Sequence, residues 1–249
     1  MCIRDSTSAL LCVKLGVSFW VALPIAGLTA GVVGLLFGLP SLRIKGLYLF
    51  MSTLAAQFII TYLIMNAGRA ITGGSYGQSA PAPQIGNIVF DSPKSFYYIA
   101  IPICIIMTFL AKNIVRTRMG RAFIAIRDND IAAEVMGVNL FRYKLTAFFI
   151  GCFYAGIAGS LLVHHFRHAS PDYFSLMVSI WMLGMLIVGG MGSILGAILG
   201  ATFVKFLDEV IAMAGPAIHR AFPFLTPAFT AAMGLMVFAL VVILFLIYE

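Results

Sequence analysis

Long stretches without a charged residue constrain the fold of this chain more than any other feature of its sequence. The 249 residues contain no Asp, Glu, Lys or Arg across 15–42, 46–68, 95–111, 145–166, 173–204 and 221–248. Most of these stretches reach the ~17–25 apolar residues that a helix needs to cross a ~30 Å hydrocarbon core. Charged residues make up only 10% of the chain, less than half the share of about 25% in soluble domains. The pattern excludes a soluble enzyme, a disordered chain and a nucleic-acid-binding module, and it predicts an all-α polytopic membrane protein.

The charge-free stretches predict the positions of the membrane-spanning helices. We expect about seven spans, at 18–40, 46–66, 96–115, 143–164, 175–191, 193–213 and 229–248. The segment 67–95 is rich in Gly, Ser and Pro, which indicates an irregular loop. Glycines at 189, 190 and 192 interrupt the run 175–213, and they are compatible either with a tight turn between two spans or with a kink in one.

Basic residues concentrate between two of these spans. Seven Lys and Arg residues fall within 112–144, and such residues gather in cytoplasmic loops of membrane proteins. We therefore expect 116–142 to be a cytoplasmic loop. Alternation then places Arg43 and Lys45 inside and the segments 67–95, 165–174 and 214–228 outside. The net charge of +7 follows mainly from this topology.

The cytoplasmic loop contains the pattern of one short helix. Asp128, Asn129 and Asp130 supply candidate caps and negative charge at a helix start. Residues 131–136 form a short helical run, and Gly137 follows where a left-handed residue would end it. So short a helix is marginal alone and normally needs a partner surface.

At this point the sequence resembles a known family. The run Gly120-Arg-Ala-Phe-Ile-Ala-Ile-Arg127, followed by residues 131–144, is similar to LivM-type branched-chain amino acid permeases of ABC importers. The resemblance continues through 46–49, 72–75, 155–159, 170–172 and 189–193. The pattern Ala132-Ala133-x3-Gly137 looks like the EAA-type loop of ABC importer permeases, although Glu134 follows the two alanines whereas the general motif places its acidic residue before them.

The resemblance implies the transmembrane helix bundle of an ABC importer permease in a bacterial or archaeal cytoplasmic membrane. It implies import of branched-chain, hydrophobic amino acids without a cofactor. The implied partners are a sister permease subunit, two ATPase subunits, an extracytoplasmic solute-binding protein and membrane lipid, with no nucleic acid. A urea or short-amide permease of the same family and a self-sufficient secondary transporter are the alternatives.

The short helix and its flanks are the implied ATPase-coupling loop, in which an apolar face enters a groove of the ATPase. Its residues are Arg121, Arg127, Asp130, Ile131, Ala132, Ala133, Val135, Met136 and Gly137. The two arginines either form a basic rim around that contact or hold the loop at the lipid surface.

Two sets of small residues are candidates for close helix packing or for a transport path. Gly27/Gly31, Gly34/Gly38 and Gly151/Ala155/Gly159 recur at four-residue spacing, which predicts close helix packing. Residues Gly189, Gly190, Gly192, Gly196 and Gly200 serve either packing or a transport path through a helix break. Residues Thr72, Gly73, Gly74, Ser75 and Tyr76 either shape an outer vestibule, receive the binding protein or form an ordinary turn.

The sequence predicts no catalytic and no metal site. It lacks a Walker-type phosphate loop, and its four cysteines include no CxxC spacing. The cluster His164, His165 and His168 is more typical of solvated residues at the outer end of a span than of a metal site. Lys205, Asp208 and Glu209 are expected near the outer end of another span. There, Lys205 and Glu209 are spaced to pair, and a role in the transport path is the alternative.

We expect residues 1–6 to be a non-native addition, because Met-Cys-Ile-Arg-Asp-Ser looks like a translated sequencing adaptor. The expectation for 7–249 is a single transmembrane permease domain truncated at both ends.

Overall fold

The computed structural model describes residues 18–41, 47–67, 78–79, 81, 83–85, 88–89, 92–170, 175–190, 192–221 and 227–248. Several predictions concern residues outside these ranges: the non-native addition at 1–6, the inside position of Arg43 and Lys45, and the outer vestibule at 72–76.

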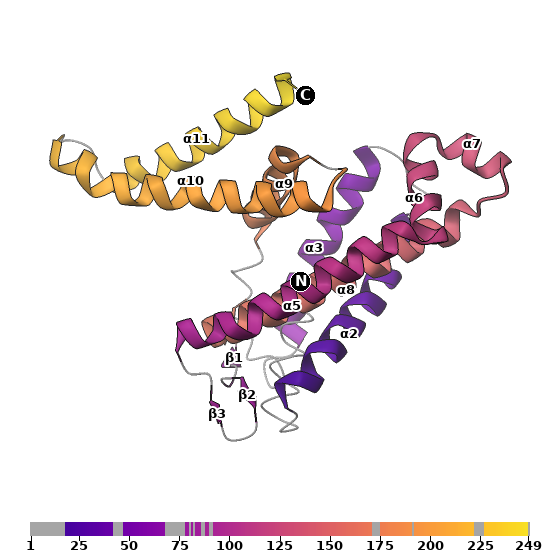
Figure 1. The fold of residues 1–249 in the computed structure, drawn as a ribbon, viewed down its shortest axis with the longest axis horizontal. Helices are drawn as coiled ribbons and strands as arrows, with labels where there is room; N and C mark the ends of the chain where they lie inside the picture. The colour runs from indigo at the N-terminus through magenta and orange to yellow at the C-terminus, as the bar shows by residue number, and fades with distance from the viewer. Residues whose placement is uncertain are drawn as a thin grey trace. The chain divides into compact units, whose positions relative to one another are not determined.

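Helices make up most of the described chain. In order they are α2 (Phe19–Ser41), α3 (Leu47–Ala67), α5 (Pro93–Arg116), α6 (Arg118–Asp128), α7 (Asp130–Val135), α8 (Leu140–Phe166), α9 (Leu176–Gly189), α10 (Ile194–Ala221) and α11 (Pro227–Tyr248) (Figure 1). Short strands lie between them: β1 (Gln78–Ser79), β2 (Gln84–Ile85), β3 (Ile88–Val89) and β4 (His168–Ala169). β1 pairs antiparallel with β4, and β2 pairs antiparallel with β3.

Each predicted span coincides with a helix, which confirms the all-α class. Within the described residues, three helices are long and apolar enough to cross a membrane by themselves: Phe19–Leu39, Lys94–Arg116 and Leu140–Phe166. α9 and α10 meet this test only as a pair bent by 119°, which makes them a broken span or a re-entrant loop. The predicted span 175–191 is thus a shorter helix that ends at Gly189.

α10 is longer than predicted, which changes the position of its charged residues. The helix continues to Ala221 instead of ending at 213, so Lys205, Asp208 and Glu209 lie near its middle. The predicted pairing of Lys205 with Glu209 is wrong. The Lys205 Nζ atom lies 3.6 Å from Asp208 Oδ2 and 4.6 Å from the ring centroid of Trp181.

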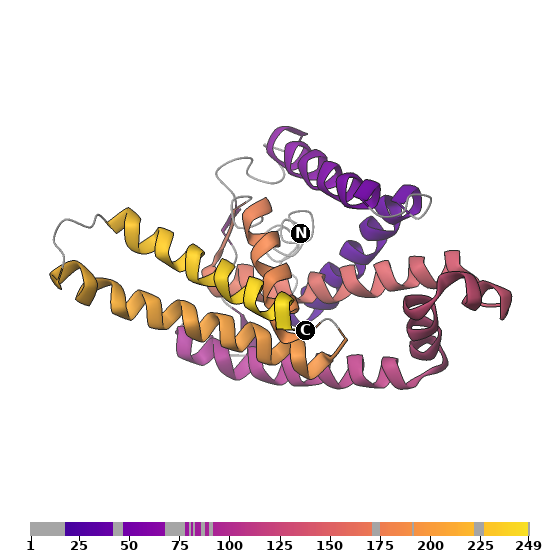
Figure 2. The same ribbon diagram turned by 90° about the horizontal axis from the view of Figure 1, so that it is seen from above.

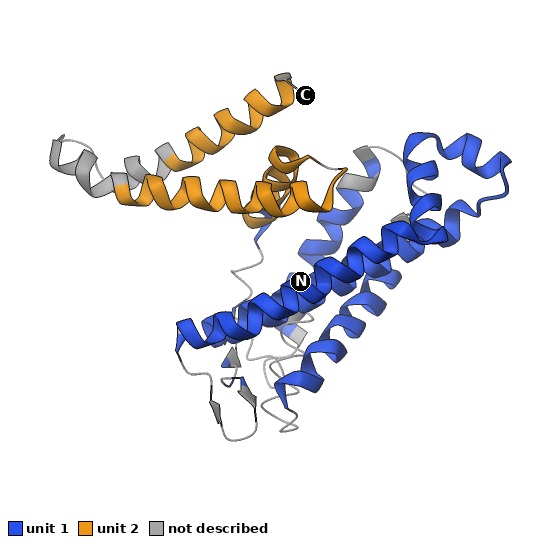
Figure 3. Cartoon of the chain, viewed as in Figure 1, with its two compact units in different colours: residues 1–176 blue, residues 177–249 orange. Residues whose placement is uncertain are grey.

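The chain divides into two compact units, Met1–Leu176 and Met177–Glu249 (Figure 3). In the first unit, α2 and α8 form the most extensive helix pair. The α2 glycines receive bulky side chains of α8, as the spacing predicts: a Cβ on Gly27 would lie 2.9 Å from the Phe153 ring. On α8 the predicted set Gly151/Ala155/Gly159 is wrong at Gly151, where a Cβ would have no neighbour within 4 Å. Gly159 is buried, and a Cβ on Gly156, which was not predicted, would lie 2.6 Å from the Cα of Gly27.

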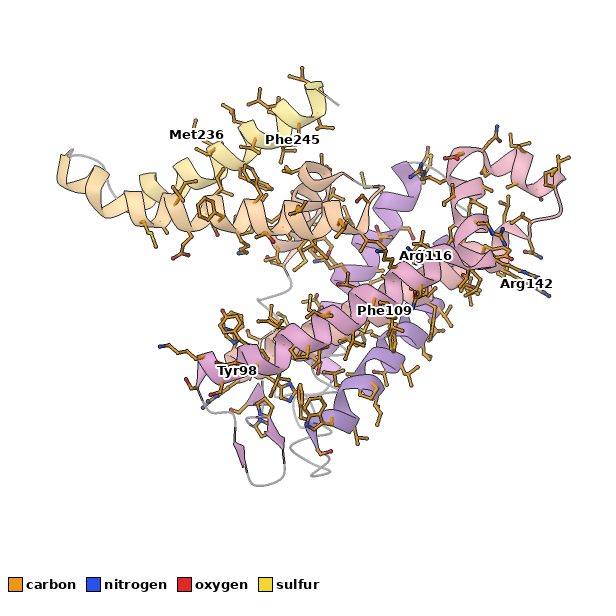
Figure 4. All side chains as sticks on the ribbon, viewed as in Figure 1. Tyr98, Phe109, Arg116, Arg142, Met236 and Phe245 are labelled. Atoms are coloured by element: carbon orange, nitrogen blue, oxygen red, sulfur yellow. The ribbon has the colours of Figure 1, made fainter. Side chains whose placement is uncertain are left out.

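α5 runs antiparallel to α8 in the same unit. The hydroxyl of Tyr154 in α8 donates to the carbonyl oxygen of Met107 in α5 at 3.1 Å. At one end, the rings of Phe96 and His165 are 5.2 Å apart, and β1 pairs with β4. At the other end, Arg116 of α5 and Arg142 of α8 adjoin α6 and α7, while Tyr98 lies toward the far end of α5 (Figures 2 and 4). The segment 116–142 thus lies at the opposite end of the α5–α8 pair from β1 and β4, and the assignment of these ends to membrane sides stays a prediction.

The second unit is organised around the glycines at the break. α9 ends at Gly189, Gly190 has a positive φ of 85°, and α10 begins at Ile194. A Cβ on Gly189 would overlap the backbone of Gly196, and a Cβ on Gly200 would lie 2.6 Å from the Cα of Gly189. These glycines therefore allow the two helices to touch beside the turn. From α11, the Phe238 ring packs against Trp181 of α9 at 5.5 Å.

Candidate functional site

The candidate site is the pair of short helices, α6 and α7, between the ends of α5 and α8 (Figure 2). The sequence pattern predicts a loop with one short helix at 131–136, whereas in the structure α6 forms a further helix before it. α6 begins at a tight turn after α5. The Thr117 hydroxyl accepts from the Gly120 backbone N–H at 3.4 Å and donates to the Ile114 carbonyl oxygen at 2.6 Å. Only glycine fits at position 120, because a Cβ there would overlap the Val115 carbonyl group.

α6 turns one side toward the rest of the unit and the other outward. Gly120 and Ala122 are buried, and the Phe123 ring meets the Tyr143 ring of α8 edge-on with centroids 6.1 Å apart. Arg121, Ile124 and Arg127 are exposed. The Nε atom of Arg127 lies 3.3 Å from Asp128 Oδ1, so the charge of Arg127 is partly balanced by its sequence neighbour.

Asn129 caps the start of α7. Its side-chain oxygen accepts from the backbone N–H of Ala132 at 3.0 Å, and this selects Asn129 among the three predicted cap residues. Asp130 makes a different interaction, in which its Oδ2 lies 3.6 Å from the Nζ atom of Lys144 in α8. The three residues Asp128, Asn129 and Asp130 therefore bind three different partners.

Gly137 ends α7 as the sequence predicts. Its φ is +84°, the left-handed region that L-residues with a Cβ rarely adopt. The Gly137 N–H donates to the Glu134 carbonyl oxygen at 2.9 Å, and the Val138 N–H donates to the Ala133 carbonyl oxygen at 3.0 Å. These two bonds are the Schellman pattern of a helix C-terminus. A side chain at 137 would meet nothing within 4 Å, so conformation alone requires the glycine.

The apolar side chains of α7 extend away from the unit. Ile131 is 70% exposed, Val135 83% and Met136 84%, whereas Ala133 is 4% exposed. Ala132 is also exposed. Ala133 thus packs inward, and the other four residues form an outward apolar face of a helix that is capped at both ends. Exposed aliphatic side chains gathered on one face are typical of a surface that binds another protein.

The other predicted site residues are placed as follows. Gly189, Gly196 and Gly200 come together at the α9–α10 turn, whereas Gly192 is exposed within the turn. His164 is not solvated as expected: it is 2% exposed, its Nδ1 donates to the Ser160 carbonyl oxygen at 2.8 Å, and its ring lies 4.8 Å from that of Phe19. Within the described ranges, no three His, Cys, Asp or Glu residues lie close enough together to hold a metal ion.

Two residues of the site, Tyr143 and Lys144, have no individual role in the sequence prediction. Both lie in the run 131–144 that resembles the family, and Lys144 also belongs to the basic cluster. The available signal was their position in the first turns of the span after the loop, beside the Asn139 cap, whose side chain accepts from the Arg142 N–H at 3.1 Å.

Comparison with known proteins places the chain among transport proteins. Residues 5–246 match the family model described as branched-chain amino acid transport system / permease component. The high-affinity branched-chain amino acid transport system permease protein LivM of Escherichia coli (strain K12) is 35% identical over 82% of this chain and 54% of that protein.

More distant relatives carry other names. The autoinducer 2 import system permease protein LsrC of Escherichia coli O9:H4 (strain HS) is 26% identical over 77% of this chain and 57% of its own length. The ribose import permease protein RbsC of Haemophilus influenzae (strain ATCC 51907 / DSM 11121 / KW20 / Rd) is 23% identical over 65% of this chain and 51% of its own length. The chain spans about half the length of the curated relatives that it matches. No solved structure matches it.

Proposed function

This chain belongs to the family of branched-chain amino acid transport system permease components, and on that premise we propose that it is a membrane-spanning subunit of an ATP-driven importer of branched-chain amino acids. It is an all-α, multi-pass protein of the cytoplasmic membrane. The substrate class is supported by the higher identity to LivM than to LsrC and RbsC, whose names refer to autoinducer 2 and ribose.

ATP hydrolysis is assigned to separate subunits, because the sequence contains no phosphate-binding loop. The proposed complex contains this chain, a sister permease subunit, two ATPase subunits and an extracytoplasmic solute-binding protein. In it, α7 enters a groove on an ATPase subunit, and Arg121 and Arg127 lie at the rim. The observation that carries this proposal is the outward face formed by Ile131, Ala132, Val135 and Met136.

Reconstitution of the complex tests the function directly. The full-length permease, its sister subunit and the ATPases are placed in proteoliposomes, with the binding protein on the outer side, and uptake of labelled leucine is measured. We expect uptake only when the ATPases and ATP are both present. Uptake of urea in place of leucine would favour a short-amide permease, and uptake by the permease pair without ATPases would favour a secondary transporter.

The orientation is tested by labelling single cysteines in a variant without native ones. Asn129→Cys at the start of α7 and Lys94→Cys at the opposite end of α5 both replace exposed residues. We expect an impermeant thiol reagent added to whole cells to modify the cysteine at 94 and not the one at 129, because 116–142 is basic and cytoplasmic. Ready modification at 129 would contradict the proposed topology.

A further inference from the structure

An ion pair joins α7 to α8. The Lys144 Nζ atom lies 3.6 Å from Asp130 Oδ2, and the two side chains are 34% and 31% exposed. The Arg127–Asp128 pair differs in both respects, because it lies within α6 and its side chains are 66% and 62% exposed. A further pair, Lys205–Asp208, lies within α10. Among these three pairs of the described chain, only Asp130–Lys144 connects two helices.

The ion pair sits where the short helices meet a long rigid element. Asp130 is the first residue of α7, directly after the Asn129 cap. Lys144 lies in the second turn of α8, a helix of 27 residues that packs along α2. The ring of the neighbouring residue, Tyr143, meets the Phe123 ring of α6 edge-on. The first two turns of α8 therefore hold one contact from each short helix.

We propose that Asp130 and Lys144 are positioning residues that transmit movement of α7 to α8 during transport. This inference rests on the proposed function, in which an ATPase subunit holds the outward face of α7. That face and the ion pair use different residues, since Ile131, Val135 and Met136 are largely exposed whereas Asp130 and Lys144 are about two-thirds buried. Docking of the ATPase and transmission to the membrane are therefore separable by mutation.

The partial burial explains why this pair suits the role. Charges that are shielded from water and ions attract each other more strongly than exposed charges do. An ion pair also opposes separation of the two groups that it joins, because the opposite charges of the carboxylate and the ammonium group attract each other. A displacement of α7 would then be followed by the beginning of α8 instead of being absorbed in the connection 136–139.

The test measures the coupling of ATP hydrolysis to leucine uptake in the reconstituted complex, in addition to assembly of the complex. Asp130→Asn and Lys144→Met each remove one charge, and the double variant Asp130→Lys/Lys144→Asp reverses the pair. Asp128→Asn is the matched control, because it removes an exposed pair within α6. Three quantities are measured for each complex: ATPase co-purification, the rate of ATP hydrolysis with loaded binding protein, and leucine uptake.

We expect the two single variants to retain the ATPases while the number of ATP molecules hydrolysed per leucine rises about tenfold, within the range of typical coupling effects. The double variant should recover most of the coupling, and Asp128→Asn should keep the wild-type number of ATP molecules hydrolysed per leucine. An unchanged ratio in both single variants would overturn the inference.

The reversed pair decides the matter if a single variant fails to assemble. An assembled and coupled double variant supports the inference, whereas a double variant that is uncoupled or does not assemble overturns it. Failure of the proposed function is recognised separately, because the wild-type complex would then show no ATP-dependent leucine uptake.

Discussion

The α2–α8 pair and the short helix α7 place their side chains in different surroundings. In the pair, glycine backbones receive large side chains of the facing helix, such as Phe149 against Gly31. In α7 and at its C-cap, Val135 and Met136 extend outward without a described neighbour to cover them. Acyl chains solvate apolar side chains as well as protein does, so a span selects its neighbour by close approach. Water solvates apolar side chains poorly. Apolar side chains that are exposed in a connection between spans therefore indicate a surface that binds another protein. Changes in the pair should affect folding, and changes in α7 should affect binding.

The largest effect is expected from Gly156→Leu. A Cβ at this position would lie 2.6 Å from the Cα of Gly27 and 3.1 Å from the Ala26 carbonyl oxygen, and backbone atoms cannot rotate away. Overpacking of this kind costs up to about 3 kcal/mol, so little folded permease should survive detergent extraction. The measurement is the yield of monodisperse protein and its thermal midpoint. Gly151→Leu is the control, since that position has no neighbour within 4 Å and should behave like the wild type.

The next largest effect is expected from Val135→Asp, which should leave the membrane domain folded. Val135 is 83% exposed, so the change removes no internal contact. In the ATPase groove it would lose the burial of an aliphatic side chain, worth roughly 1.5–3 kcal/mol, and would bury a carboxylate. We expect at least about a tenfold loss of ATPase co-purification, equal to 1.4 kcal/mol, together with loss of uptake. Val135→Ile keeps the apolar surface and should bind normally. Normal binding by Val135→Asp would show that α7 is not the docking element.

Gly137→Val should have an intermediate effect, which distinguishes the conformation at the end of α7 from the apolar face of that helix. The added side chain would meet nothing within 4 Å, but φ at +84° costs a residue with a Cβ roughly 1–2 kcal/mol. The end of α7 should loosen, and ATPase association and uptake should both fall by about tenfold, with normal insertion. Gly137→Asn provides the control, because Asn tolerates the left-handed region better. Equal loss in both variants would mean that the position contacts the partner directly.

The sequence predicted the parts of the fold that local chemistry determines. The spans follow from uninterrupted apolar composition, and the end of α7 follows from Gly137, whose positive φ only glycine adopts readily. α6 was missed because Arg118, Arg121 and Arg127 make the segment appear as a basic loop, whereas the Thr117 cap and the buried Gly120 form it into a helix.

Features that depend on distant residues were not predictable in this way. His164 is buried because Phe19 of α2 packs on its ring, and nothing near 164 in the sequence indicates that contact. Likewise, Gly156 rather than Gly151 faces α2, because the rotation of α8 about its axis depends on the whole α2–α8 interface. Lys144 also needed the structure, since its partner Asp130 is reached only after the connection folds back.

The smallest effects are expected from substitution of Arg121 and Arg127. These effects distinguish a contact with the ATPase from a contact with the lipid surface. Exposed ion pairs contribute about 0.2–1 kcal/mol, so Arg121→Gln and Arg127→Gln should each weaken ATPase association by less than about fivefold, and added salt should reduce the difference from the wild type. Arg127 already lies 3.3 Å from an Asp128 oxygen, so part of its charge is balanced and Arg121→Gln should have the larger effect. If the arginines instead hold the connection at the lipid surface, both variants should bind the ATPases normally in detergent and lose activity only in vesicles that contain anionic lipid. Co-purification at two salt concentrations, with uptake in neutral and anionic vesicles, therefore decides whether this basic rim belongs to the protein contact or to the membrane.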